Sequence, residues 1–373
     1  MKNFKKFYSA LVIMFALTLL VACGDKTATE SKCADNKNQP KTEEKTEPAE
    51  KKDLELGVMK DVDPSKKVYI TAKEAKDIID KGGNCVVAEV TWGEEKDSPD
   101  FLTKHIPGAI HINTDMVEEG PIWNLRSPEE LEKNFLNYGI TSDTSLVLYG
   151  PGIAADRVAY AALYLGVKDV KIIDGRLAAW EKEGYPVEEG SVAPNPQTDF
   201  GVAVPAHPEY VLSLEETVKK LDEDKDFKLV SVRSREEWEG KTSGYSYIPK
   251  AGEPNGAVFG ESGTGNSGME NYINADETVK DFADIVNLWK ENGFDVSNDM
   301  AFYCGTGWRA ATPWLLMYER GYDVKMFDGG WNEWQMHDEL EAEVNDPEGT
   351  KIVPVKDLTP DKAAKWQNFQ KRD

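Results

Sequence analysis

The sequence predicts an α/β fold in which two similar domains each contain a mainly parallel sheet flanked by helices. One observation is a repeat: residues 147–150 resemble residues 301–304, and an Asp-Gly pair follows each segment at the same distance, at Asp174 and Asp328. Short apolar segments also alternate with amphipathic helical segments in both halves, which is typical of parallel sheets. A folded part of about 300 residues is too long for one average domain and suits two.

Capping residues indicate where the helices begin. Residues 71–74 and 213–216 form capping boxes, each of which opens the first helix of its half. Ser127 caps a further helix in the first half, and we expect Asn274 with Glu277 to do so in the second. The apolar segments predicted as strands are residues 86–88, 146–149, 170–173, 229–230, 300–303 and 324–327.

The N-terminal segment has the features of an export signal. Residues 1–22 combine early lysines with an apolar stretch that is too short to span a bilayer comfortably. The stretch ends in Leu-Val-Ala-Cys, which resembles a bacterial lipoprotein box. The resemblance implies a lipidated Cys23 that anchors the protein to a bacterial membrane outside the cytoplasm, at the cell surface or in the periplasm. An ordinary signal peptide followed by a chance cysteine is the alternative.

Composition divides the rest of the chain. Residues 23–66 hold the lipidated cysteine and a polar stalk, which we expect to be disordered because it has few large apolar residues to bury. Domains are predicted at residues 67–190 and 209–340, joined by a proline-rich linker at residues 191–208. A polar tail at residues 341–373 either straps the surface or lies loose.

The net charge of −23, from 44 basic and 67 acidic residues, argues against nucleic-acid binding. An anionic substrate would therefore need a local basic pocket. The cysteines show neither a disulfide framework nor metal-ligand spacing, so no metal and no cofactor are expected. Cys85 is predicted to lie in the core and Cys33 to be an inert exposed thiol. We expect a monomer.

Cys304 is the predicted nucleophile. It follows an apolar strand, opens a glycine-rich turn and precedes a helix that ends near Gly321. At such a junction, backbone N–H groups and the positive end of a helix dipole stabilise a thiolate. The alternative is a small buried cysteine at a strand end, because free cysteine is among the most buried residue types.

Three further segments carry a resemblance to a known family. Residues 105–109 are His-Ile-Pro-Gly-Ala, residues 229–234 are Leu-Val-Ser-Val-Arg-Ser, and residues 328–331 are Asp-Gly-Gly-Trp. With the repeat, they make the folded part similar to tandem-domain rhodaneses, which are thiosulfate or 3-mercaptopyruvate sulfurtransferases. The periplasmic multidomain rhodaneses resemble it most. The resemblance implies two rhodanese-like domains, of which the second is catalytic and the first, with Gly150 in place of the cysteine, is an inactive scaffold.

The resemblance also implies sulfur transfer through a persulfide on Cys304. A small anionic donor, thiosulfate or a similar compound, would give its outer sulfur to the thiolate, and cyanide or a thiol would accept it. Arg233 would support the loop by hydrogen bonds to carbonyl groups. The persulfide would be cradled by the loop residues Gly305, Thr306, Gly307, Trp308 and Arg309.

Other residues of the second half have two interpretations or depart from the family pattern. Arg309 would bind the anionic end of the donor or stabilise the thiolate. Trp308 either walls the pocket or packs on the first domain. Ser231 and Glu237 differ from the residues of many thiosulfate enzymes, so thiosulfate need not be the natural donor. The loop at residues 240–268 is either a lid over the catalytic cysteine or a plain insertion.

Two other functions remain open from the sequence. Phosphatases and arsenate reductases of this fold use a longer loop with five residues between Cys and Arg, whereas four residues separate Cys304 from Arg309. The loop length therefore favours sulfur transfer. The second alternative is a surface lipoprotein that binds sulfur compounds or carries a persulfide without turnover.

Overall fold

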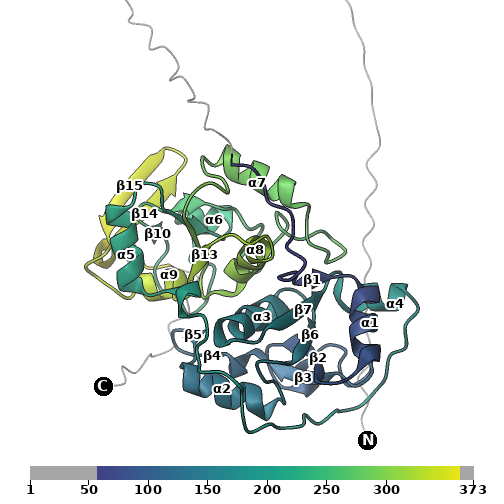
Figure 1. The fold of residues 1–373 in the computed structure, drawn as a ribbon. Helices are drawn as coiled ribbons and strands as arrows, with labels where there is room; N and C mark the ends of the chain where they lie inside the picture. The colour runs from purple at the N-terminus through teal and green to yellow at the C-terminus, as the bar shows by residue number, and fades with distance from the viewer. Residues whose placement is uncertain (1–56, 362–373) are drawn as a thin grey trace, which may run out of the picture. The chain divides into compact units, whose positions relative to one another are not determined.

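The structure, a computed structural model, describes residues 57–361 of the 373-residue chain. Two α/β halves each contain a five-stranded sheet whose neighbouring strands are all parallel, flanked by helices (Figure 1). The strand order is β1-β7-β6-β2-β3 in the first sheet and β8-β13-β12-β9-β11 in the second. The predicted α/β fold class is confirmed, and the matching strand orders support a duplicated domain.

The six segments predicted as strands all lie within strands of these two sheets. The first sheet consists of β1 (Tyr69–Ile70), β2 (Cys85–Thr91), β3 (Ile110–Asn113), β6 (Ser145–Tyr149) and β7 (Asp169–Ile173). The second sheet consists of β8 (Val211–Leu212), β9 (Lys228–Ser231), β11 (Val258–Phe259), β12 (Met300–Tyr303) and β13 (Val324–Phe327). A small hairpin in the first half consists of β4 (Glu118–Glu119) and β5 (Asn124–Leu125).

The capping boxes at Thr71, Ser127 and Ser213 open helices as predicted. The helices of the first half are α1 (Ala72–Lys81), α2 (Pro128–Asn137), α3 (Ala154–Leu165) and α4 (Arg176–Lys182). Those of the second half are α5 (Leu214–Glu223), α6 (Arg235–Trp238), α7 (Phe282–Glu291), α8 (Trp308–Tyr318) and α9 (Gly330–Trp334).

The prediction of a helix at Asn274 and Glu277 is wrong. The backbone N–H of Asn274 donates to the carbonyl of Thr278 at 2.8 Å, and Glu277 has a φ of 63°. The segment is a turn, because the short polar side chain of Asn274 bonds to neighbouring groups instead of capping a helix. Helix α7 begins later, after the Asp281 cap.

Helices α3 and α8 pack against each other and join the two halves (Figure 1). The rings of Tyr160 and Trp314 meet edge to face at a centroid distance of 4.8 Å. The hydroxyl of Thr312 donates to the Asp156 carboxylate at 3.0 Å. Since both helices begin directly after the loops that contain Gly150 and Cys304, their packing places the two loops near the boundary between the halves.

The predicted ends of the folded part need correction. Residues 57–66 do not belong to a detached stalk, because the N–H of Asp63 donates to the carbonyl of Glu319 at 2.7 Å and Lys60 lies over the Tyr322 ring. The linker at residues 191–208 lies along the first half and buries Phe200. Much of the predicted tail forms two strands, β14 (Glu341–Asp346) and β15 (Gly349–Pro354), which join β10 (Glu253–Pro254) in a three-stranded antiparallel sheet.

The predicted signal at residues 1–22, Cys23 and Cys33 lie outside the described residues. Among residues 57–361, no helix has both the length and the apolar character that crossing a membrane requires.

Candidate active site

Cys304 lies directly after β12, a central strand of the second sheet between β9 and β13. Parallel α/β sheets bind ligands at the carboxyl ends of their strands, which is where this thiol lies. Its side chain is buried, with 0% exposed. Helix α8 begins at Trp308, and Gly307 takes the cap position with a φ of 87°. The predicted order of strand, tight loop and helix is therefore present.

The loop after Cys304 is held through its carbonyl groups. The carbonyls of Cys304 and Gly305 accept hydrogen bonds from the N–H groups of Trp331 and Asn332 at 2.8 and 3.0 Å. Within residues 57–361, the N–H groups of Gly305, Thr306 and Gly307 have no hydrogen-bond acceptor. Buried or partly buried amides normally find a partner, so these donors suit an anion held in the loop.

Glycine is required in this loop because other groups approach its backbone closely. A Cβ added to Gly305 would lie 2.3 Å from the Tyr245 ring, so that ring packs directly on the loop. A Cβ on Gly307 would lie 2.5 Å from Nη1 of Arg157, which belongs to the first half. Gly330 lies outside this loop but packs on it, because a Cβ added to Gly330 would lie 2.4 Å from the Cys304 carbonyl oxygen. The loop is therefore enclosed by both halves.

Arg309 is fully buried and forms a two-pronged ion pair with Glu237. Its Nη1 and Nη2 donate to the two carboxylate oxygens at 2.7 and 2.9 Å. Burial opposes ionisation of Glu237, yet the charges of Arg309 and Arg233 lower its pKa to about 2. Because the charge of Arg309 is compensated inside the protein, this geometry favours support of the loop over binding of an anionic donor.

Arg233 holds the 240–268 loop in place. Its Nη1 donates to the Gly252 carbonyl at 2.7 Å, and its Nη2 donates to the Ser243 carbonyl at 3.0 Å. The predicted use of carbonyl acceptors is thus seen in this loop rather than in the loop that carries Cys304. The 240–268 loop in turn supplies Tyr245, which packs on Gly305. Arg233 therefore supports the cysteine loop indirectly.

Glu253 is a site residue that sequence reasoning missed. It is buried, it pairs with Nη1 of Arg233 at 2.7 Å, and it accepts hydrogen bonds from the hydroxyls of Ser231 and Tyr303. Burial raises its pKa to about 7, against the opposing charge of Arg233. Many rhodaneses have Asp at the position of Ser231, and here a carboxylate still reaches Arg233 from another loop. The sequence signal for such a partner was Arg233, a cation two residues after Ser231.

The 240–268 loop covers the loop that carries Cys304. Besides the Tyr245 ring, it supplies the Ser262 hydroxyl and the Gly265 carbonyl, and both accept from Nη1 of Arg309 at 3.2 Å. A plain insertion would not make these contacts. The structure therefore favours the interpretation as a cover.

A cleft of about 500 Å³ lies beside the cysteine loop. Thr306 and Trp308 reach it from that loop, and the indole Nε1 of Trp308 donates to Glu118 of the first half at 2.6 Å. Trp308 therefore both walls the cleft and contacts the first domain. The cleft is lined by Trp92, Glu118, Trp123, Pro151, Gly152, Ile153, Tyr245, Tyr247, Asn266, Ser267, Thr306 and Trp308.

Glu118 belongs to a buried ion-pair network that crosses between the halves. Nε of Arg157 donates to Glu118 at 3.0 Å, and Nη1 of the same arginine donates to Asp328 at 2.5 Å. Burial raises the pKa of Glu118 to about 7, while Arg157 opposes the rise. Neither half completes this network alone.

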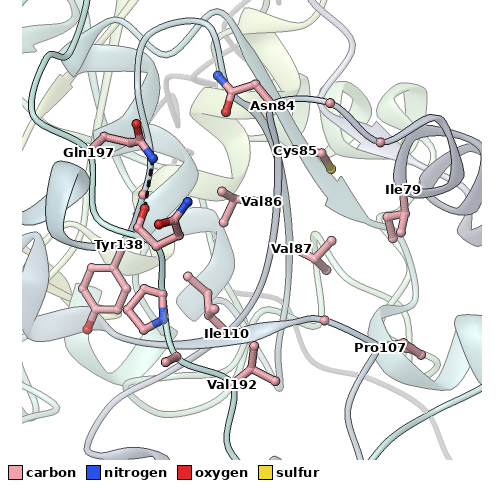
Figure 2. Close-up of a pocket in the computed structure, with 17 residues that line it drawn as sticks. Ile79, Asn84, Cys85, Val86, Val87, Pro107, Ile110, Tyr138, Val192 and Gln197 are labelled. Atoms are coloured by element: carbon pink, nitrogen blue, oxygen red, sulfur yellow. Dashed lines mark hydrogen bonds between the residues drawn. The ribbon is translucent and has the colours of Figure 1, made fainter.

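Another cavity, of about 390 Å³, lies in the first half and is lined in part by Cys85 (Figure 2). Burial raises the pKa of the Cys85 thiol, with a smaller contribution from Asp169. Cys85 is only partly buried, so it lies at the edge of the core predicted for it. A thiol with a raised pKa is a poor nucleophile at neutral pH, so Cys85 is not a second catalytic candidate.

Comparisons with known proteins agree with this arrangement. Residues 71–183 and 214–337 each match the Rhodanese-like domain family. Thiosulfate sulfurtransferase YnjE of Escherichia coli is 41% identical over 268 residues, which are 71% of this chain and 59% of that protein. Sulfur carrier protein TtuD of Thermus thermophilus is 32% identical over 250 residues, which are 63% of this chain and 83% of that protein.

Solved structures show the same relationship. The crystal structure of YnjE has a TM-score of 0.70 at 37% identity and covers 75% of this chain and 68% of its own. The structure of wild-type EanB has a TM-score of 0.69 at 32% identity and covers 74% of this chain and 68% of its own. Other EanB structures contain hercynine or ergothioneine, and one is described as a cysteine persulfide with ergothioneine. Two of these relatives are named for sulfur chemistry, YnjE as a thiosulfate sulfurtransferase and TtuD as a sulfur carrier protein.

Proposed function

The chain belongs to the rhodanese family, and we propose that it is a sulfurtransferase which carries sulfane sulfur as a persulfide on Cys304. One observation carries the proposal: the thiol at the end of β12 is followed by three amides, those of Gly305, Thr306 and Gly307, that lack an acceptor within residues 57–361. Such amides can stabilise a thiolate or a persulfide anion without a basic side chain.

The reaction has two displacement steps. The Cys304 thiolate attacks the outer sulfur of a donor such as thiosulfate, the sulfur–sulfur bond of the donor breaks, and sulfite leaves with the electron pair. A thiophilic acceptor, cyanide or a thiolate, then attacks the outer sulfur of the persulfide. The sulfur–sulfur bond of the persulfide breaks, the thiolate of Cys304 is regenerated, and thiocyanate or an acceptor persulfide leaves.

Loop geometry disfavours the phosphatase and arsenate reductase alternative. An oxyanion enzyme of that kind needs a free arginine to bind its substrate, and both terminal nitrogens of Arg309 donate to Glu237. The loop also has the shorter spacing of four residues between Cys304 and Arg309. Absence of phosphate release from a small aryl phosphate, alongside sulfur transfer, would settle the choice.

A persulfide carrier is the second candidate. The observation that favours it is the complete burial of Cys304, which shields a persulfide from solvent nucleophiles. One relative, TtuD, is named a sulfur carrier protein. A carrier would form the persulfide but discharge it only to a specific acceptor, so small thiols and cyanide would not turn it over.

Thiosulfate and cyanide test the proposal. The full chain is treated with thiosulfate, and its intact mass is compared with that of Cys304→Ser. We expect one added sulfur atom in the wild type and none in the variant, with thiocyanate formed when cyanide follows. If thiosulfate fails, 3-mercaptopyruvate is tried as donor. Absence of added sulfur with both donors would contradict the proposal, and added sulfur without turnover would favour the carrier.

We also propose that lipidation of Cys23 anchors the protein to a bacterial membrane. The Leu-Val-Ala-Cys sequence at the end of the apolar stretch supports this. Metabolic labelling with a radioactive fatty acid should mark the wild-type chain and not a Cys23→Ala variant. Equal labelling of both would contradict the anchor.

A further inference from the structure

Arg176, at the start of α4 in the first half, occupies the position that Gly330 occupies in the second half. Each residue follows an Asp-Gly pair, and both have a positive φ, 56° for Arg176 and 55° for Gly330. Glycine adopts this left-handed conformation freely, whereas a residue with a long side chain is strained there. Such strain persists where surrounding contacts impose it, and it clusters at functional sites. The first half thus retains an arginine where glycine would be less strained.

The guanidinium of Arg176 is buried but only partly hydrogen-bonded. The residue is 2% exposed, and its Nη2 donates to the Asp156 carboxylate at 2.9 Å and to the Gly152 carbonyl at 3.2 Å. Within residues 57–361, Nε and Nη1 have no acceptor. In Arg309, by contrast, both terminal nitrogens donate to Glu237. Buried donors are almost always paired, so the two free N–H positions of Arg176 suit an acceptor from outside the chain.

Arg176 lines a cavity of about 240 Å³ at the carboxyl end of the first sheet. Glu89 reaches this cavity from β2, and Tyr149 and Gly150 reach it from the end of β6. Parallel sheets bind ligands at this edge. The cavity therefore lies where the first half has glycine in place of the cysteine of the second half.

The other charges that line the cavity are mostly negative. Lys104 pairs with Glu181 at 3.1 Å, and Glu277 accepts a backbone N–H of the first half at 3.0 Å. Glu89 is 3% exposed, and burial raises its pKa, with a further contribution from the charge of Asp100. Among residues 57–361, neither Glu89 nor Asp100 has an ion-pair partner. Two carboxyl groups in the cavity are therefore available to a cationic group.

We propose that this cavity binds a small aliphatic α-amino acid as its zwitterion. The carboxylate of the ligand accepts from the unpaired N–H groups of Arg176, and its ammonium group lies beside Glu89 and Asp100. An anion alone would be repelled by the acidic side chains, and an amine alone would leave the arginine donors unpaired. A zwitterion satisfies both sets of groups. The proposal does not rest on the proposed function, because Cys304 takes no part in it.

The size and the lining of the cavity restrict the side chain of the ligand. Its volume lies below the range of about 300–1,000 Å³ that is typical of ligand pockets, so it suits a small molecule. Pro99, Leu177 and Ala178 line it beside the charged groups and offer apolar contacts. A side chain of the size of alanine or valine fits these surroundings.

Titration calorimetry on the full-length chain tests the ligand class. L-Alanine is compared with propionate, which lacks the ammonium group, and with ethylamine, which lacks the carboxylate. L-Valine, 3-methylbutanoate and isobutylamine form a second matched set. In at least one set, we expect the amino acid to bind at least tenfold more tightly than either analogue. A smaller advantage in both sets, or no binding of either amino acid, would overturn the proposal.

An exposed variant assigns the ammonium group. Asp100→Asn changes an exposed side chain and should fold normally. We expect it to weaken binding of the amino acid severalfold and to narrow its advantage over the analogue that lacks the ammonium group. Glu183→Gln, which is also exposed but lies outside the cavity, is the matched control and should change neither quantity. Equal effects of the two variants would overturn the role given to Asp100.

A second variant assigns the carboxylate. Arg176→Gly suits the positive φ and removes the donors, so binding of the amino acid should weaken at least tenfold. Because it also removes the counter-ion of the buried Asp156, circular dichroism checks its folding, and Asp100→Asn remains the test if it does not fold. Unchanged binding in a folded Arg176→Gly variant would overturn the proposal.

The Cys304→Ser variant separates this site from that of the second half. We expect it to bind the amino acid as tightly as the wild type does, because Cys304 does not line the cavity. Loss of binding in Cys304→Ser would place the ligand at the cysteine loop and would overturn the assignment to the first half.

Discussion

The two halves share one topology, and they differ most at a single equivalent position. In the second half, Cys304 follows the central strand β12, and in the first half, Gly150 follows β6. A Cβ added to Gly150 would lie 2.2 Å from the Val90 carbonyl oxygen. The first half has therefore lost the space for a side chain as well as the thiol. Restoring a lost site there needs backbone movement in addition to a new residue.

The first half nevertheless contributes to the site of the second. It supplies Trp92, Glu118 and Trp123 to the cleft, and its Arg157 donates to Asp328. In the reverse direction, Asp174 of the first half accepts the N–H of Val279 at 2.8 Å, and Glu277 of the second half accepts the N–H of Gly152 at 3.0 Å. A duplicated domain that loses its own site can thus be retained because it walls the site of its partner.

The largest effect is expected at the nucleophile. Cys304→Ser should reduce thiocyanate formation by about a thousandfold or more, because serine is a poor nucleophile for sulfane sulfur. Adding Gly150→Cys to this variant should restore nothing, because the Val90 carbonyl occupies the space. Thiocyanate assays and intact masses check both. Any activity regained by Gly150→Cys would contradict the loss of space inferred for the first half.

Loss of the carboxylate that joins two buried arginines should destabilise the second half strongly. Glu237→Gln leaves Arg309 and Arg233 without this counter-ion, so unfolding in urea should show a loss of about 3–5 kcal/mol. The exposed Glu236→Gln is the matched control and should change stability by less than about 0.5 kcal/mol. Comparable losses in the two variants would contradict the role assigned to Glu237.

The same carboxylate should affect acid stability. The folded-state pKa of Glu237, about 2, is below its ordinary value, so its contribution is present at neutral pH and is lost as pH falls toward 2. Urea unfolding between pH 5 and pH 2 should therefore show a smaller loss of stability in Glu237→Gln than in the wild type. An identical pH dependence would show that the charge is not held by the two arginines.

Alanine substitutions at one glycine in each half compare the two halves directly. Gly307→Ala meets Arg157 at 2.5 Å and also requires a positive φ, so we expect a loss of about 2 kcal/mol and at least tenfold lower activity. Gly184→Ala, in the turn after α4 of the first half and outside the cleft, meets nothing within 4 Å and should lose about 1 kcal/mol with activity retained. Equal activity losses would mean that Gly307 acts only through stability.

The smallest effect concerns Glu118 between the halves. Its folded-state pKa of about 7 lies above its ordinary value, so the folded state keeps a proton that the unfolded state releases, and stability falls as pH rises from about 4.5 to 7. In Glu118→Gln this fall should be smaller in urea unfolding, because glutamine has no proton to release. An unchanged fall would mean that Glu118 is ionised throughout that range.

Local sequence signals predicted much of the fold. Apolar segments marked the central strands, and capping boxes at Thr71, Ser127 and Ser213 marked helix starts, because strand burial and helix capping depend on neighbouring residues. The short edge strands, such as β8 and β11, and the hairpin of β14 and β15 were not predicted. Their polar or short segments become strands only when partner strands lie beside them.

Spacing along the chain was enough to predict the α/β class, the duplication and the cysteine at the end of a central strand. Folding was needed to show that Arg309 is paired with Glu237, that Glu253 reaches Arg233, and that the halves share an aromatic cleft. These contacts join residues far apart in sequence. The partners that a buried side chain meets therefore depend on which charges and rings the fold places around it.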